Sequence, residues 1–130
     1  MDLLDDFPAV ARTTLLELAR LQGARTNPRA EEEPGRILHE QRTAEDPHYA
    51  GLAVDWDFPY YGSVDATPQW INLLWAYCER QGGRDALESL ELGEHLRAAI
   101  AWVLRRMDDP RGGGYLWVQR SNSHGIRNQV

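Results

Sequence analysis

Lysine is absent from this sequence of 130 residues, cysteine occurs once, and long apolar runs are missing. All 14 basic residues are arginine, which is more typical of biased codon usage than of a function. The single Cys78 cannot form an internal disulfide, and its apolar helical surroundings predict a buried small side chain rather than a nucleophile. No stretch is long and apolar enough to cross a bilayer. The opening Met-Asp-Leu-Leu-Asp-Asp has no basic residue, so we expect no signal peptide and a cytoplasmic location.

Several signatures of catalysis and metal binding are also missing. His39-Glu40 begins like the helix of a zinc protease, but Thr43 stands where a second histidine is needed. The four histidines, at 39, 48, 95 and 124, show no ligand spacing, so we expect no metal site. No serine lies in a Gly-x-Ser-x-Gly turn, and residues 112–114 lack the Lys and Ser/Thr of a phosphate loop. Neither a cofactor nor hydrolase chemistry of these kinds is predicted.

The charge and composition favour a globular chain that binds neither nucleic acid nor membranes. The net charge of -6 argues against a general nucleic-acid surface or an anionic-membrane surface. With 42% hydrophobic and 26% charged residues, the chain is expected to fold rather than remain disordered. Its length suits one domain, which we place over residues 1–130.

Apolar residues at helical spacing predict three helices. The first begins at Pro8 and ends at Gly23, the second covers 68–81, and the third covers 92–107. Residues 27–57 contain turns and a long polar loop, and the acidic triplet at 31–33 is interpreted as a solvated face. A short strand-like run follows at 115–118. We therefore expect an all-α fold of helical hairpins with long loops and a short β segment near the C-terminus.

The helix over 68–81 is apolar on most of its circumference, so it needs neighbours on several sides. Trp70 and Trp75 from this helix, and Trp102 from the next one, are predicted core residues. The apolar stripe of the third helix is formed by Leu92, Leu96, Ala99, Ile100, Val103, Leu104 and Met107. Three helices cannot easily enclose the second one. We therefore expect a fragment of a larger helical assembly, or an obligate oligomer.

The stretch Tyr60–Trp70 combines aromatic rings, one carboxylate and a helix start. Thr67 is predicted to cap the helix and Pro68 to be its first residue, so Asp65 would lie just outside a helix N-terminus, where an anion is favoured. Aromatic rings beside a fixed carboxylate suit a polyhydroxylated ligand such as a sugar. The alternative is structural, because such an aspartate can form an Asx-turn and paired tyrosines often only pack.

Carboxylates and aromatic rings are also the residue types of glycoside hydrolysis, for which Glu40 and Asp65 are candidates in principle. Four segments occur in the order expected for one family: residues 32–42, 60–68, 113–116 and 124–129. Through them the chain, over about residues 8–130, resembles the bacterial amylo-alpha-1,6-glucosidases, the glycogen-debranching type of glycoside hydrolase. The resemblance implies an (alpha/alpha)6 toroid around a loop-lined pocket, and an inverting attack on alpha-glucosidic bonds.

The resemblance also implies which residues contact sugar. Arg42, Tyr61 and Asp65 correspond to sugar-subsite residues, Glu40 is expected to orient Arg42, and Trp117 is expected to stack on a sugar at the rim. Asn128 and Gln129 complete the predicted substrate-binding set.

In that family the Asn-Gln pair is followed by Trp-Lys-Asp-Ser, whose Asp is the general acid, whereas Val130 follows it here. By resemblance, neither catalytic carboxylate lies within these 130 residues. Twelve helices of about 12 residues with their loops need roughly 200 residues, which agrees with a partial toroid.

The sequence therefore predicts a fragment of an alpha-glucan debranching-type enzyme that contributes sugar-subsite loops and is inactive alone. Its expected partner is an alpha-glucan or oligosaccharide. A non-catalytic carbohydrate-binding module is one alternative. Another is a module that self-associates through exposed apolar helix faces, and a third is an inert or unstable product of a shortened reading frame.

Overall fold

The computed structural model describes residues 3–43 and 57–116, which form helices joined by loops. In chain order the helices are α1 (Leu3–Asp6), α2 (Pro8–Arg20), α4 (Ala66–Gln81), α5 (Arg84–Leu90) and α6 (Gly93–Met107), followed by the 3-10 helix η1 (Pro110–Gly112). In this part of the chain β structure is limited to two isolated bridges, Asn27 with Glu32 and Glu40 with Tyr60. The predicted all-α class is confirmed for these residues.

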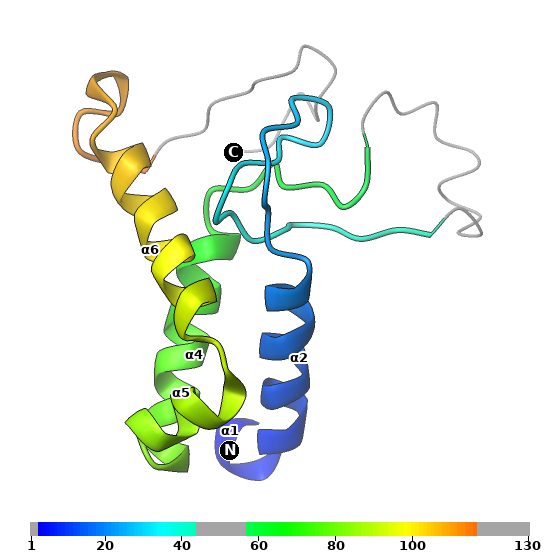
Figure 1. Ribbon diagram of the computed structural model, residues 1–130, viewed down its shortest axis with the longest axis vertical. Helices are drawn as coiled ribbons and strands as arrows, with labels where there is room; N and C mark the ends of the chain where they lie inside the picture. The colour runs from blue at the N-terminus through cyan, green and yellow to red at the C-terminus, as the bar shows by residue number, and fades with distance from the viewer. Residues whose placement is uncertain (1–2, 44–56, 117–130) are drawn as a thin grey trace.

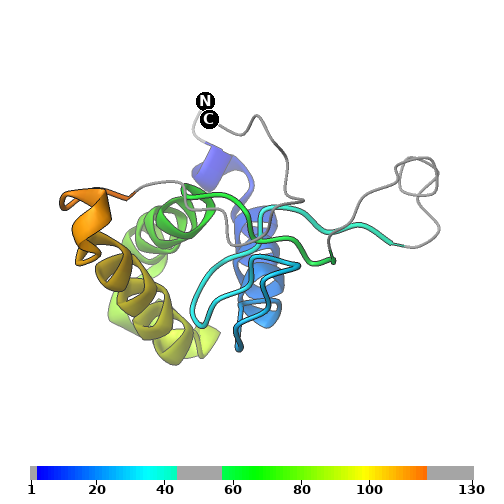
Figure 2. The same ribbon diagram turned by 90° about the horizontal axis from the view of Figure 1, so that it is seen from above.

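Helix α4 is central, because it contacts α1, α2, α5 and α6. The three long helices α2, α4 and α6 run along the longest axis of the molecule (Figure 1), and the view from above shows them packed around one another (Figure 2). The loops of residues 21–43 and 57–65 gather at one end of these helices, beyond the C-terminus of α2 and the N-terminus of α4 (Figure 1). Candidate ligand-binding residues in the two loops therefore lie at the same end of the molecule.

The first long helix begins where the sequence predicts. Pro8 lies in the first turn of α2, where its missing N–H leaves no bond unmade, and Ala11, Leu15 and Ala19 form the buried face. The helix ends at Arg20 rather than at Gly23. Gly23 instead lies in a loop contact, in which its N–H donates to the Arg36 carbonyl at 2.8 Å.

The start of α4 differs from the prediction by two residues. The helix begins at Ala66 with Asp65 as its N-cap residue, so Pro68 is the third helical residue. The first free amides are satisfied by Ser63, whose Oγ accepts from the N–H groups of Asp65 and Ala66 at 3.3 Å each. Thr67 is therefore not the cap. Its side chain is fully buried, and its Oγ1 accepts from the Ile37 N–H at 2.9 Å, which ties the first loop to the helix.

The predicted end of α4 is confirmed. Gly82 has a φ of +107°, and its N–H donates to the Cys78 carbonyl. This left-handed conformation suits glycine because it has no Cβ. Cys78 itself is buried and forms no disulfide, as predicted.

Two of the three tryptophans predicted in the core are there, and one is not. Trp70 and Trp102 are 2% and 1% exposed, whereas Trp75 is 66% exposed. The buried residues of α4 are Thr67, Trp70, Leu74, Tyr77 and Cys78. Successive residues of an α-helix are about 100° apart around its axis, so Trp75 points to a different side of α4 from the buried Leu74. The neighbours of α4 in the described part of the chain therefore leave one side of this helix uncovered.

The apolar stripe predicted for α6 is also only partly buried. Ala99 is fully buried, but Ile100, Leu104 and Met107 are 41%, 53% and 40% exposed. The reason is a close contact with the first loop, where a Cβ on Gly35 would lie 2.1 Å from the Ala98 carbonyl oxygen. This contact turns the Trp102 face of α6 toward the loop and leaves part of the stripe at the surface.

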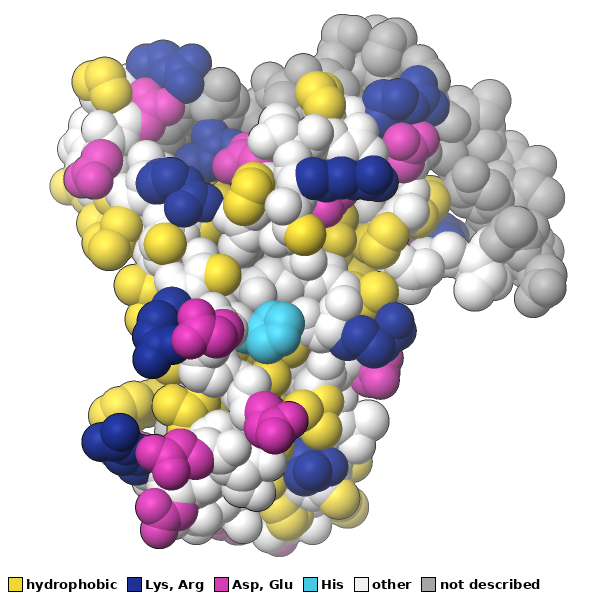
Figure 3. All heavy atoms as spheres, viewed as in Figure 1, with side chains coloured by type: hydrophobic (Ala, Val, Ile, Leu, Met, Phe, Trp, Pro, Cys, Tyr) yellow, Lys and Arg dark blue, Asp and Glu magenta, His cyan; other side chains and the backbone are white. Residues whose placement is uncertain are grey.

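Acidic and basic side chains lie side by side over the helices on the face drawn in Figure 3. Examples are the pairs Arg84 with Glu88 and Arg97 with Glu94, each within one helical turn. Among the residues that the structure describes, no helix combines the length and the apolar character needed to cross a membrane.

Candidate functional site

The two loops that carry the predicted ligand-binding residues are joined by backbone hydrogen bonds. The Tyr60 N–H donates to the Glu40 carbonyl at 2.8 Å, and the Tyr60 carbonyl accepts from the N–H groups of His39 and Glu40 at 2.8 and 3.1 Å. This pairing brings residues 39–42 alongside 60–61, although the two segments are about 20 residues apart. Segments that carry separate predicted motifs thus lie side by side, with Tyr60 and Tyr61 buried and residues 40–42 nearer the surface.

Glu40 and Arg42 form the side-chain pair that the family resemblance implies. The Arg42 Nε donates to the Glu40 Oε1, and the side chains are 29% and 24% exposed. Both groups are thus partly shielded while remaining at the surface. The pair holds the planar guanidinium of Arg42 in one orientation, and such a group can donate two parallel hydrogen bonds.

Asp65 is an exposed carboxylate held by neighbouring side chains. The Ser63 hydroxyl donates to its Oδ1, and the Gln69 Nε2 donates to its Oδ2 at 2.7 Å. The hydrogen bond from Ser63 lowers the pKa of Asp65, and the nearby His39 lowers it further. Asp65 is therefore ionised at neutral pH. It suits the role of a hydrogen-bond acceptor, whereas a general acid would need a raised pKa.

Tyr61 lies in the core rather than on a ligand-accessible surface. It is 4% exposed, and its hydroxyl donates to the Leu21 carbonyl at 2.6 Å, at the end of α2. Its backbone N–H donates to the Ala30 carbonyl at 2.8 Å. Burial raises the pKa of Tyr61, and the nearby Glu32 raises it further. In this structure Tyr61 joins the second loop to the first loop and to α2, and its contact with a ligand stays a prediction.

A buried arginine supports this region, and the sequence analysis missed it. Arg36 is 3% exposed, its Nη1 donates to the Glu31 carbonyl at 2.9 Å, and its Nη2 donates to the Ser63 carbonyl at 3.0 Å. Its guanidinium carbon lies 5.2 Å from the centre of the Trp102 ring. Burial lowers the pKa of Arg36, whereas Glu33 and Glu31 raise it. Arg36 therefore binds the backbone of Ser63, the residue whose side chain orients Asp65.

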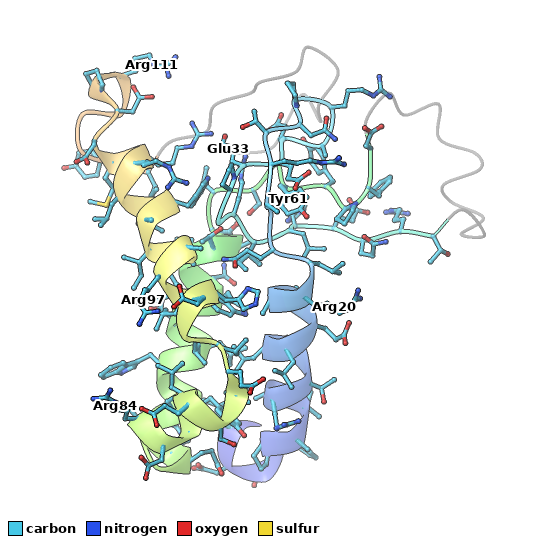
Figure 4. The ribbon with its side chains drawn as sticks, viewed as in Figure 1. Arg20, Glu33, Tyr61, Arg84, Arg97 and Arg111 are labelled. Carbon is cyan, nitrogen blue, oxygen red and sulfur yellow. The ribbon has the colours of Figure 1, made fainter. Side chains whose placement is uncertain are left out.

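Glu33 connects the same arginine to α6. Its carboxylate accepts from the Trp102 Nε1 at 2.9 Å and from Arg106, and it lies 3.8 Å from the Arg36 Nη1. Figure 4 shows Glu33 between the loops and the upper part of α6. The interpretation of residues 31–33 as a solvated face is therefore wrong. Glu31 is 3% exposed, and the side chains of Glu32 and Glu33 are only 12% and 26% exposed.

No local pattern marks this network, because its members come from residues 31–36, 63 and 102–106. Three acidic residues in a row are usually solvated, and the burial predicted for Trp102 does not indicate that its indole N–H and Arg106 contact Glu33. One local signal for this network was present in the sequence. Pro34-Gly35 directly follows the acidic triplet and indicates a tight turn, which could hold the carboxylates of residues 31–33 against a neighbouring element.

Three predicted ligand-binding residues, Trp117, Asn128 and Gln129, lie outside the described residues, as does part of the strand-like run at 115–118. Within residues 3–43 and 57–116, no three His, Cys, Asp or Glu side chains are grouped so that they could hold a metal ion.

No model of a known protein family matches this chain, and no curated protein is similar enough to count as a match.

Proposed function

We propose that this chain is part of an alpha-glucan debranching-type glycoside hydrolase and that it contributes loops that contact sugar. The observation that carries the proposal is the pairing of Tyr60 with Glu40. It brings an oriented Glu40–Arg42 pair to the same end of the helices as the exposed carboxylate of Asp65. The sequence resemblance adds the family and the substrate class.

The chemistry of these groups favours binding over acid catalysis. The ionised Asp65 can accept hydrogen bonds from sugar hydroxyls, and Arg42 can donate to ring or hydroxyl oxygens. A glycosidase acid must hold a proton at neutral pH, which a lowered pKa opposes. In this proposal the acid and the base of the reaction are residues other than Asp65.

Asp65→Asn is expected to weaken the binding of a maltooligosaccharide at least tenfold, or by about 1.4 kcal/mol. The amide loses the charge and one acceptor oxygen, so it makes fewer and weaker hydrogen bonds with hydroxyl groups. Isothermal titration calorimetry of the 130-residue chain with maltotriose measures this change.

The matched control is Asp85→Asn. Asp85 is also an exposed aspartate at the start of a helix, but it lies in the first turn of α5, away from the two loops. It is expected to leave the affinity unchanged. Equal losses in the two variants would contradict a specific role for Asp65. Release of glucose by this chain that persists after Asp65→Ala would contradict the assignment of binding without catalysis.

A second candidate function is self-association, which the uncovered apolar side chains of α4 and α6 favour. These are Trp75, Ile100, Leu104 and Met107, which are between 40% and 66% exposed. Trp75 and Ile100 also line a cavity of about 710 Å³ between α4, α5 and α6, whose walls are mainly apolar. Apolar patches of this kind often mark interfaces.

For this second function, Trp75→Ser is expected to weaken self-association at least tenfold, because an exposed tryptophan at the centre of an interface commonly dominates its energy. Sedimentation velocity over a range of concentrations measures the association constant, with and without maltotriose. Val10→Ser is the control, since Val10 is 63% exposed but lies on α2. A monomer at all concentrations in the unmodified chain would exclude self-association.

A further inference from the structure

A separate polar pocket lies on the other flank of the second loop. It has a volume of about 340 Å³, and its walls are Arg25, Asn27, Ala30 and Glu32 of the first loop and residues 57–59 of the second. This volume falls within the range of about 300–1,000 Å³ that is typical of small-ligand sites. Tyr60 pairs with Glu40 and Tyr61 pairs with Ala30, so the second loop runs between the pocket and the Glu40–Arg42 pair.

The first wall of the pocket is a tight hairpin. Asn27 and Glu32 exchange two backbone hydrogen bonds of 3.0 Å each, and the Asn27 Oδ1 accepts from the Arg29 N–H at 3.1 Å. The Glu32 carboxylate accepts from the Arg25 N–H at 3.3 Å and from the Arg25 Nε at 3.3 Å. The polar groups of this wall are therefore positioned before any ligand binds, which lowers the entropic cost of binding.

The second wall is held to the first by the side chain of Asp57. Its Oδ1 accepts from the Arg29 Nε at 3.1 Å, and its Oδ2 accepts from the Asn27 Nδ2 at 3.4 Å. The Asp57 N–H donates to the Arg29 carbonyl at 3.3 Å. Phe58 and Pro59 add apolar surface next to these groups.

The charged side chains at the pocket are paired. Glu32 pairs with Arg25, and Asp57 pairs with Arg29 just outside the pocket walls, so these four side chains carry no net charge and favour neither an anion nor a cation. The groups can still bind neutral partners, because a carboxylate oxygen can accept about two hydrogen bonds and the amino groups of arginine are additional donors. Hydroxyl groups both donate and accept, so a polyhydroxylated ligand matches this mixture of donors and acceptors beside an apolar wall.

We propose that this pocket binds a neutral pyranose unit, with Arg25, Asn27 and Asp57 contacting its hydroxyl groups. The site is distinct from Asp65, Glu40 and Arg42. The inference goes beyond the proposed function, because the pocket would bind a sugar whether or not those residues do.

Maltotriose titrated into the ¹⁵N-labelled chain tests this site by NMR. We expect chemical-shift changes at residues 25–32 and 57–58, including the Asn27 side-chain amide. Arg25→Ala is expected to weaken binding at these signals at least tenfold. The side chain of Arg25 is 78% exposed, so its removal is expected to preserve the fold, which the remaining amide signals report directly. Arg97→Ala, which removes a side chain that is 72% exposed on α6, is the matched control and is expected to have no effect. Succinate, as an anionic probe, is expected not to shift these signals.

The outcomes separate this inference from the proposed function. Shifts at 25–32 that weaken in Arg25→Ala but persist in Asp65→Asn support the pocket, even if Asp65 binds nothing. Shifts confined to the surroundings of Asp65, unaffected by Arg25→Ala, overturn the pocket and leave the proposed function standing. Shifts at 25–32 caused by succinate overturn the neutral ligand class. No shifts with maltotriose overturn the pocket and the sugar-binding role together.

Discussion

Replacing Trp102 with alanine is expected to lower the free energy of unfolding by about 3–5 kcal/mol, the usual loss for a buried tryptophan. Trp102 is 1% exposed, and its Nε1 donates to Glu33 at 2.9 Å. The guanidinium carbons of Arg36 and Arg106 lie 5.2 and 5.8 Å from the centre of its ring. The substitution therefore leaves a cavity and removes one hydrogen bond and two cation–π contacts. Because domains of this size are stable by about 5–15 kcal/mol, the expected loss is a substantial fraction of the total stability.

Urea unfolding followed by far-ultraviolet circular dichroism measures this loss, and Trp75→Ala is its control. Trp75 has the same side chain and also lies on a helix, but it is 66% exposed. Its removal should change the unfolding free energy by no more than about 0.5 kcal/mol, as is usual for surface sites. If the two substitutions lowered the midpoint equally, the burial of Trp102 against the first loop would be wrong.

Arg36→Met is expected to destabilise the fold by about 3 kcal/mol. It breaks the hydrogen bonds from the guanidinium to the Glu31 and Ser63 carbonyls and removes the positive charge beside Glu33. Removal of one partner from a buried ionic network leaves the other charge without compensation, which commonly costs about 3–5 kcal/mol. The partial exposure of Glu33 places the expected loss at the lower end. Urea unfolding again gives the value.

Arg36→Lys separates the charge from the geometry. Lysine keeps the charge, but its single ammonium cannot reproduce the planar fork that reaches two carbonyls and lies against a tryptophan ring. We expect it to restore less than half of the stability lost in Arg36→Met. Arg97→Met, on the exposed face of α6, should be nearly neutral. Full recovery by lysine would mean that only the charge of Arg36 matters.

The local parts of the candidate site could be predicted from the sequence. The pairing of Glu40 with Arg42 was expected from the family resemblance, and it forms between residues only two positions apart. Asp65 was expected next to a helix N-terminus, and it lies there, although as the N-cap residue itself. Ser63 was not identified as the residue that accepts from the first amides, because Thr67-Pro68 is also a good helix start and a sequence cannot rank the two.

The supporting network could not be predicted, because its contacts join distant segments. The Trp102 Nε1 and Glu33 are 69 residues apart, and Arg36 and Ser63 are 27 residues apart. Tyr61 shows the same limit. Its aromatic ring and hydroxyl suit a sugar site as well as a core. In this structure the hydroxyl donates to the carbonyl of Leu21, 40 residues away, and the side chain is buried.

Local sequence signals predicted the three long helices, the start of α2 at Pro8 and the end of α4 before Gly82, because a proline, a glycine and the spacing of apolar residues act over one or two turns. They did not predict the end of α2, the start of α4, or the short helices α1 and α5. The sequence by itself also determined the charge balance and the single buried cysteine. Which helix faces are covered depends instead on contacts between elements that are distant in the sequence. Ile100 and Trp75 are as apolar as buried residues, but burial depends on what packs against a side chain. The contact of Gly35 with α6 turned a different face inward, toward Glu33 and Arg36.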